Sequence, residues 1–355
     1  MFYLPVSTVF HNKNFLALTD RRVDKGQFDF KNLYGDGRNI RRAIANHFNS
    51  THQEMAGVVT GEYIVFPNCQ IMVDQDGLCS VLNSRQHLWA ALNVDEYCSS
   101  ENFFNELEDV LRMWDRHPVI EQSAILSDPY SENYYHWSLE MIPRIRLLDK
   151  RRVRRIVVKS ASLSHAFQRS LLHYTVDDLE VVPINIPVRV INPFVVDGMM
   201  SQEGMLWLRH KTGLLAKKGK RRIYIRRGAR GTRSSAGGGI SEAPEFMSML
   251  QAKGFEKVEF SADMTVAEQV NTLSGAEIIL SAHGAALTNI LYLEKGVCLI
   301  EVIGRGAPRA MYMQISKYIG LSYYGYISEE NDDEGNMIIN SQQINSIIES
   351  ICRGD

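Results

Sequence analysis

The chain has few cysteines, and no two of them are close together in the sequence. Its 355 residues include five cysteines, none of which forms a C-x-x-C motif. This argues against a disulfide framework and against a zinc knuckle, and it favours a reducing compartment. The five positions are Cys69, Cys79, Cys98, Cys298 and Cys352.

The sequence also lacks the apolar segments of membrane and exported proteins. No stretch approaches the roughly 20 apolar residues that a membrane span needs. The first residues, MFYLPVSTVFHNKNF, contain no basic start followed by an unbroken apolar run. We therefore expect a cytoplasmic protein, which can still work as a peripheral protein at the inner face of a membrane.

Charge is nearly balanced overall but is segregated along the chain. The formal net charge is −2, so no global field draws the protein to nucleic acid or anionic lipid. Between Glu203 and Glu242, eleven Lys and Arg residues occur without an acidic residue, whereas EENDDE at 329–334 has the opposite sign. A basic run is often only a solvated surface. This one surrounds an apolar strand and precedes a glycine cluster at 237–239, which favours an anion site.

The length of the chain and the order of its apolar segments predict two domains of the α/β class. A chain of this length exceeds one hydrophobic core. Short strand-like segments fill the first hundred residues, and strands alternate with helices from residue 119, which predicts a parallel sheet covered on both faces. We expect a β-rich start and then an α/β part over 1–205, a nucleotide-binding domain over 206–335, and a terminal amphipathic helix over 336–355.

A D-x-D motif in the first part has two interpretations. Asp74 and Asp76, in VDQDG, have the spacing with which some sugar-transferring enzymes hold a divalent metal. Asp76–Gly77 between two apolar runs is also a hairpin signal, because both residues tolerate positive φ. We favour the hairpin and expect no metal site.

Three strands of the second half carry residues suited to an anionic ligand. In open α/β sheets, ligands bind beyond the carboxyl ends of parallel strands. The first strand ends in Arg226 and Arg227, whose forked guanidiniums match diphosphate oxygens. The second ends in His283–Gly284, where small residues let a ligand approach the backbone at a helix start. Glu301 on the third suits the hydroxyls of a ribose.

Each of these residues also has a structural interpretation. A single histidine at a strand end is often only hydrogen-bonded, the arginines can flank a strand, and Glu301 can pair with one of them. Their joint placement on neighbouring strands favours a nucleoside-diphosphate pocket. The absence of G-x-G-x-x-G and G-x-x-x-x-G-K-[ST] argues against a dinucleotide redox site and a P-loop.

His136 and Glu140, in NYYHWSLEMIPRIRLL, form a second candidate site. Their i, i+4 spacing places both on one face of a helical turn, and Arg144 follows four residues later, suited to an acceptor or a phosphate. Pro143 cannot donate a helical hydrogen bond, so we expect a kink or a restart there. The alternative is a structural amphipathic helix in which His136 is only hydrogen-bonded.

Together these segments resemble glycosyltransferase family 61, which includes capsular-polysaccharide enzymes. The resemblance covers 130–303 and implies a GT-B fold, in which two Rossmann-like domains face a central cleft. We further expect the terminal helix to pack back on the first domain. The resemblance also implies a nucleotide-sugar donor, inversion at the anomeric carbon and no obligatory D-x-D metal. The matching segments are NYYHWSLEMIPRIRLL, RRIYIRRGARGTR, EFMSMLQAKGFEKVEF and TVAEQVNTLSGAEIILSAHGAALTNILYLEKGVCLIEV.

The family's motifs match this chain residue by residue. Arg226 or Arg227 matches the arginine that ends the first C-domain strand; the family usually has Ser before it, so the choice between the two stays open. Glu268–Gln269 matches an E-Q pair, to which we assign a structural role. The loop SSAGGGIS (234–241) is longer and richer in glycine than the family's link, which indicates a mobile lid. The other matching donor-site residues are Arg233, His283, Gly284, Ala285, Ala286 and Asn289.

We therefore predict an inverting, metal-independent glycosyltransferase of bacterial capsule or other surface polysaccharide synthesis. It would move a sugar from a nucleotide-diphosphate donor, UDP-linked among the options, to an oligosaccharide or lipid-linked saccharide. An acceptor hydroxyl must lose its proton, and we assign this step to His136, with Glu140 orienting it or acting as the base itself. The strand-end arginines would stabilise the leaving diphosphate, and His283 would hold the donor.

Two other functions stay open at this point. One is a nucleotide-binding module without catalysis, in which the segment around His136 is only structural. The other is a hydrolase, which is less favoured because no G-x-S-x-G elbow is present. We expect no cofactor other than the nucleotide sugar and no nucleic-acid partner, and the sequence leaves the oligomeric state open.

Overall fold

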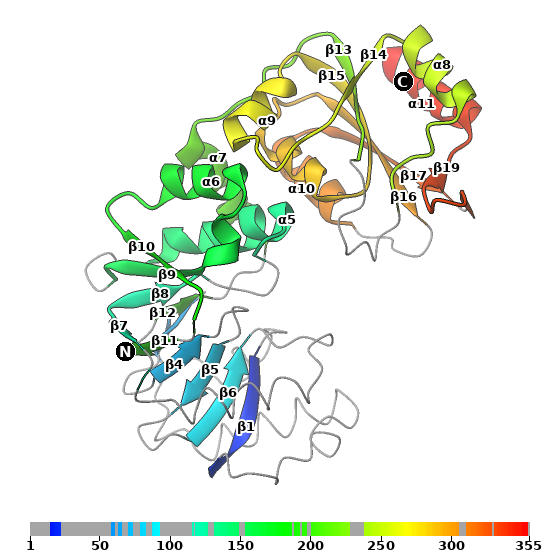
Figure 1. Cartoon of the computed structure of the whole chain (residues 1–355). Coiled ribbons are helices and arrows are strands. Elements are labelled where there is room, and N and C mark those ends of the chain that lie inside the picture. Colours follow the sequence, from blue (N-terminus) through cyan, green and yellow to red (C-terminus); the bar gives the residue numbers. More distant parts are fainter. Residues whose placement is uncertain are drawn as a thin grey trace. The chain divides into compact units, whose positions relative to one another are not determined.

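The computed structural model shows an α/β chain whose contacts divide it into two units (Figure 1). Unit 1 consists of Met1–Glu132, Glu140–Ser164 and Val176–Met199. Unit 2 consists of Asn133–Leu139, His165–Thr175 and Met200–Asp355. Two segments that precede the expected boundary at residue 205 therefore group with unit 2. The described residues are Arg116, 118–126, 131–148, 153–186, 188–191, 194–196, 200–227, 238–304, 310–328 and 330–353, with the backbone of the strands at 15–22, 58–60, 63–65, 70–73, 79–82 and 87–92.

The described strands of unit 1 form two six-stranded sheets. One has the order β1-β6-β5-β4-β11-β7 and is antiparallel except where β11 meets β7. The other has the order β10-β9-β8-β12-β3-β2 and is parallel from β10 to β12. The parallel part is the α/β section that the sequence predicts after a β-rich start. The strands are β1 Phe15–Arg22, β2 Val58–Thr60, β3 Tyr63–Val65, β4 Gln70–Val73, β5 Cys79–Leu82, β6 His87–Leu92, β7 Val119–Glu121, β8 Ser123–Ile125, β9 Arg155–Lys159, β10 Glu180–Ile184, β11 Val188–Ile191 and β12 Phe194–Val196.

The pairing of β4 with β5 confirms the predicted hairpin. The two strands are antiparallel, with Gln70 opposite Leu82 and Val73 opposite Cys79. Asp74 and Asp76 belong to the connection between these strands, which lies outside the described residues.

Unit 2 is built on five parallel strands in the order β14-β13-β15-β16-β17. In chain order this is 2-1-3-4-5, the arrangement of a flavodoxin-like doubly wound sheet. Because crossovers are right-handed, the helices that follow the first and second strands lie on opposite faces. The strands are β13 Arg221–Ile225, β14 Phe255–Val258, β15 Ala276–Ala282, β16 Cys298–Gly304 and β17 Ser322–Ser328, and a small hairpin of β18 Glu330–Asn331 and β19 Met337–Ile338 follows.

Local sequence signals explain where the helices begin and end. Thr265 caps α9 in a reciprocal capping box with Glu268, and Gly213 ends α7 with a φ of 64°. Pro143 stands at the start of a 3-10 segment, which confirms the predicted restart. Among the described helices, none is both long and apolar enough to cross a membrane. The helices are α5 Tyr134–His136, η2 Trp137–Met141, η3 Ile142–Leu147, η4 Ser160–Leu163, α6 Ala166–Thr175, α7 Gln202–Thr212, α8 Pro244–Ala252, α9 Val266–Thr272, η5 Ala285–Tyr292, α10 Met311–Ile319 and α11 Ser341–Arg353.

The terminal helix α11 packs beside α8 on unit 2 (Figure 1). Ile344 and Ile348, one helical turn apart, enter the same buried cluster as Phe246 of α8 and the side chains of the sheet face below. Lys253 and Glu349 join the two helices by an ion pair of 2.8 Å. The expectation that this helix packs back on the first domain was wrong, because its apolar stripe covers a face of unit 2's own sheet.

The burial of Ile348 predicts a large loss of stability when its side chain is shortened. Ile348→Ala leaves a cavity in a fully buried cluster, so we expect the free energy of unfolding to fall by about 2–5 kcal/mol. Ile327→Ala is the matched control, since that side chain is 57% exposed and its loss changes stability by less than about 0.5 kcal/mol. Urea denaturation of both variants tests this, and equal midpoints would contradict the packing of α11.

Candidate functional site

The register of β13 against β15 brings two predicted ligand segments together. Ile225 lies opposite Ser281, and Arg227 and His283 each come two residues after this pair. Side chains alternate across a sheet, which places Arg227 and His283 on one face and Arg226 on the other. The Arg227 Nη1 donates a hydrogen bond of 3.0 Å to the main-chain carbonyl oxygen of His283.

This meeting point is the topological switch point of the sheet. The chain leaves β13 toward β14 on one side and returns to β15 on the other. In doubly wound sheets of this order, the connections diverge between the first and third strands and leave a crevice at their carboxyl ends. Arg227 and the segment 283–286 therefore border the position where such a sheet binds its ligand.

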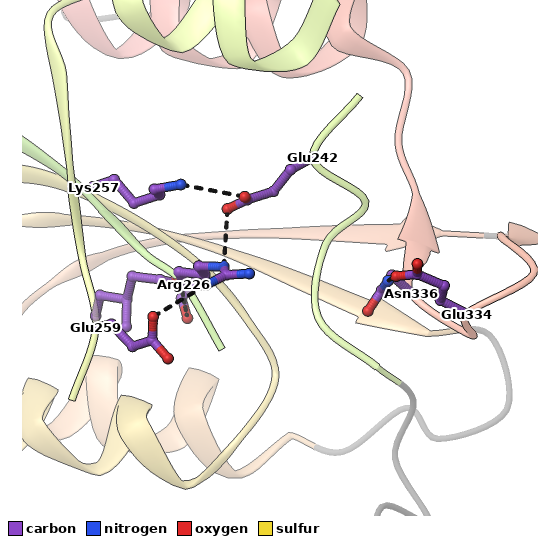
Figure 2. Close-up of polar contacts among 8 residues, drawn as sticks. Arg226, Glu242, Lys257, Glu259, Glu334 and Asn336 are labelled. Atoms are coloured by element: carbon purple, nitrogen blue, oxygen red, sulfur yellow. Dashed lines mark hydrogen bonds and ion pairs between the residues drawn. The ribbon is translucent and has the colours of Figure 1, made fainter. Parts of the chain in front are cut away.

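Arg226 is engaged on the opposite face of the strand. Its guanidinium lies 3.4 Å from Glu242 and 3.2 Å from Glu259, and Lys257 pairs with Glu242 at 3.3 Å (Figure 2). Two carboxylates thus balance Arg226, in a chain of exposed ion pairs. The geometry favours Arg227 as the arginine that faces an anion, which narrows the choice that the sequence leaves open.

The His283 ring contacts the fully buried carboxylate of Glu301. Its Nδ1 lies 2.5 Å from Glu301 Oε1, and Tyr323 donates a hydrogen bond of 2.7 Å to the other carboxylate oxygen. Burial, and then the hydrogen bond to Glu301, raises the pKa of Tyr323, so this hydroxyl stays protonated. Glu301 has no exposed surface, which favours support of His283 over the direct ribose contact that we expected of it.

Gly284, Ala285 and Ala286 are the positions at which this segment reaches the surface. They are partly exposed, whereas the side chains from Ile278 to His283 and from Leu287 to Leu293 are buried. A Cβ on Gly284 would lie 3.6 Å from the Arg227 guanidinium, so the missing side chain leaves open space beside that cation. The Gly284 backbone is extended, and η5 begins immediately after it with its first N–H groups uncapped by a side chain.

The Asn289 side chain makes its hydrogen bonds to other residues inside the protein. It is fully buried and accepts a hydrogen bond of 2.7 Å from the Tyr134 hydroxyl, whose pKa is raised by burial. Its amide donates to Gln269 Oε1 at 2.8 Å and to the Ala286 carbonyl at 3.1 Å. The structure therefore gives Asn289 a connecting role between three segments of the chain, and it supports the structural role assigned to Gln269.

His136 joins the same unit as His283 through two aromatic rings. Ring centroids lie 5.3 Å apart between His136 and Tyr135, 6.0 Å between Tyr135 and Tyr312, and 5.2 Å between Tyr312 and His283. We call these four residues the aromatic row. The Tyr312 hydroxyl also donates a hydrogen bond of 2.7 Å to the Gly284 carbonyl, so the row ends at the exposed glycine.

Glu140 and Arg144 follow His136 through an irregular helix. Residues 137–141 form a π turn, so the i, i+4 alignment that an α-helix gives to His136 and Glu140 does not apply as expected. Arg144 is buried, and its Nε donates a hydrogen bond of 2.8 Å to the Glu140 carbonyl. Because Pro143 has no N–H to donate, this contact satisfies a carbonyl at the helix break. A contact of Arg144 with acceptor or phosphate stays a prediction.

Four tyrosines for which the sequence predicts no role support this site: Tyr134, Tyr135, Tyr312 and Tyr323. Tyr134 and Tyr135 lie within the motif around His136, whereas Tyr312 and Tyr323 lie outside the predicted motifs. Arg233, the remaining predicted donor contact, lies outside the described residues. Within the described part of the chain, no group of three or more His, Cys, Asp or Glu side chains is arranged to hold a metal ion.

The fold and the site define a doubly wound α/β protein with a basic edge at the switch point of its sheet. Residues 134–300 match the family described as Glycosyltransferase 61. The match begins at Tyr134 and ends next to Glu301. It therefore contains the segment around His136, the strand-end arginines and the segment around His283. The resemblance predicted from the sequence motifs is confirmed.

A plant protein shares part of this region. Xylan glycosyltransferase MUCI21 of Arabidopsis thaliana is 29% identical over 116 residues, which are 31% of this chain and 22% of that protein. The chain therefore matches less than a quarter of the length of this curated relative.

The buried contact between Tyr134 and Asn289 predicts a measurable stability effect. Tyr134→Phe removes the hydroxyl donor and leaves a buried carboxamide oxygen without that partner, so we expect a loss of about 1–3 kcal/mol. Tyr318→Phe is the matched control, because that side chain is 37% exposed. Thermal and urea unfolding of the two variants measures the difference, and equal stability would contradict the connecting role of Asn289.

Proposed function

We propose that the chain is a glycosyltransferase that moves a sugar from a nucleoside-diphosphate donor to a saccharide acceptor. The observation that carries this proposal is the meeting of Arg227 with the exposed start of η5 at the switch point of the sheet. A guanidinium and uncapped N–H groups suit the oxygens of a diphosphate, because both supply donors and positive charge. The match of residues 134–300 to the family described as Glycosyltransferase 61 supports the sugar transfer.

The proposed reaction inverts the anomeric carbon and uses no metal ion. An acceptor hydroxyl attacks in line, its proton passes to His136 or to Glu140, and the bond to the diphosphate breaks. Negative charge develops on the leaving diphosphate, where Arg227 and the first N–H groups of η5 would stabilise it. Arg226 and Arg233 remain secondary candidates for the donor.

The domain arrangement, the acceptor, the biological process and the donor nucleotide are also proposals. We infer a GT-B arrangement, with the donor on unit 2 and an oligosaccharide or lipid-linked saccharide as acceptor. The setting would be bacterial capsule or other surface polysaccharide synthesis at the inner face of the membrane, and UDP would be one donor nucleotide. A polysaccharide acceptor fits the name of the plant relative, which is a xylan glycosyltransferase.

Neighbouring arginines on opposite faces of β13 provide a matched pair for testing the donor site. Arg227→Ala should weaken nucleoside-diphosphate affinity about tenfold or more, since a hydrogen bond to a charged group contributes about 1.5–3 kcal/mol. Arg226→Ala removes only exposed ion pairs and should change the affinity less than about twofold. Calorimetric titration with UDP, GDP and other diphosphates measures both, and a larger loss in Arg226→Ala would overturn the assignment.

Substitution of His136 separates transfer from donor binding. His136→Ala should lower sugar transfer by about 10²–10⁴-fold while leaving nucleoside-diphosphate affinity nearly unchanged, because a general base contributes to the chemical step. His173→Ala, on the exposed side of α6, is the control and should keep full activity. Product analysis with a panel of nucleotide sugars provides the readout. Full activity of His136→Ala would end its assignment as the base, and diphosphate binding without any transfer would favour the non-catalytic binding module.

A further inference from the structure

The imidazole of His283 is buried but has one ring nitrogen left for a ligand. The side chain is 4% exposed, and its Nδ1 contacts Glu301. No residue that the structure describes makes a hydrogen bond to Nε2. The residues that follow it, Gly284 and Ala285, are partly exposed, so a ligand can approach this part of the chain from the surface.

The contacts of Glu301 determine the role of each ring nitrogen of His283. Glu301 is fully buried and acts only as an acceptor when ionised, so His283 must donate through Nδ1–H. Tyr323 donates to the second carboxylate oxygen and thereby fixes the carboxylate itself. A histidine whose Nδ1–H is held by a carboxylate has its ring orientation fixed and presents Nε2 on the other side of the ring.

We propose that Glu301 and Tyr323 are positioning residues of the donor site, which present the Nε2–H of a doubly protonated His283 to the donor's diphosphate. This inference rests on the proposed function, because it identifies the ligand of Nε2 with the phosphate of that donor. His283 would then be the second cation of the site beside Arg227. Glu301 would act through His283, without touching the nucleotide.

The charged and titratable groups around the imidazole fit this assignment. Among the described residues, Glu301 on β16 supplies the negative charge that contacts the ring, and Arg227 after β13 supplies a positive charge at the His283 carbonyl. Tyr312 on α10 packs against the ring, and burial raises its pKa, so it stays neutral. Tyr323 on β17 is neutral for the same reason. A diphosphate brings the negative charge that two neighbouring cations require.

Variants of the supporting residues test the inference through affinity. We expect Glu301→Gln, which keeps the shape and removes the charge, to weaken binding of inorganic pyrophosphate and of UDP about tenfold, as loss of a supporting hydrogen-bond partner does at other ligand sites. Tyr323→Phe should weaken both in the same direction, and Tyr318→Phe, an exposed tyrosine, should leave both unchanged. Circular dichroism and thermal unfolding verify that each full-length variant is folded. Wild-type affinity in folded Glu301→Gln and Tyr323→Phe would overturn the proposal.

A spectroscopic readout of the wild-type chain tests the same point without any substitution that affects folding. In histidine-labelled protein saturated with pyrophosphate, the ¹⁵N shifts of His283 should show protons on both Nδ1 and Nε2. His283→Gln identifies the signals by their loss. An Nε2 without a proton in the pyrophosphate complex would overturn the proposal, because such a nitrogen cannot donate to phosphate.

The outcomes distinguish this inference from the proposed function. If pyrophosphate binds with the expected signature but no nucleotide sugar is turned over, the anion site stands and glycosyl transfer fails. If a nucleotide sugar is turned over while neither the variants nor the ¹⁵N signals behave as expected, glycosyl transfer stands and the role of Glu301 and Tyr323 fails. Absence of any binding of pyrophosphate, UDP or GDP to the wild-type chain would overturn both.

Discussion

The pairing of β13 with β15 is the constraint on which the rest of the site depends. Ile225 lies opposite Ser281, and this register alone puts Arg227 on the face of His283. A slip of one residue would move every side chain of the strand to the other face and bring Arg226 to the site instead. The register is held by packing, because the end of β13 and almost all of β15 are buried, and a slip would remove each of these side chains from the position in which it packs. The packing of the hydrophobic core therefore determines that Arg227, and not Arg226, lies on the face of His283.

Two buried polar groups then fix the surroundings of that edge. Glu301 and Asn289 have no exposed surface, and burying a carboxylate or a carboxamide is unfavourable unless its hydrogen bonds are made. Their partners come from the residue after β15 and from β17, α5 and α9, so each of these elements must be in place for the groups to be satisfied. Such networks are rigid when complete. The exposed start of η5 is thus supported by elements that cannot shift independently, which is what preorganised binding of an anion requires.

Much of unit 2 can be predicted from the sequence, because strand and helix periods and strand-end residues are local properties. The segments carrying Arg227 and His283 are identified in this way, as is the helix restart at Pro143. Contacts between side chains of neighbouring strands are not local in the sequence. The 18-residue spacing between His283 and Glu301 gives no sign that they touch, so a strand-end carboxylate was assigned to a ribose. For the same reason the apolar stripe of α11 predicts a packed helix without saying which sheet it covers.

The aromatic row changes how the two predicted histidines relate to each other. His136 was expected on the first domain, opposite the donor, but residues 133–139 group with unit 2. Tyr135 and Tyr312 connect the two imidazoles through edge-on and tilted ring contacts, which are specific in geometry as well as apolar. The placement of His136 relative to His283 is therefore a matter of packing inside unit 2. The ring contacts of Tyr135 and Tyr312 thus set the distance between the proposed base, His136, and the proposed donor contact, His283.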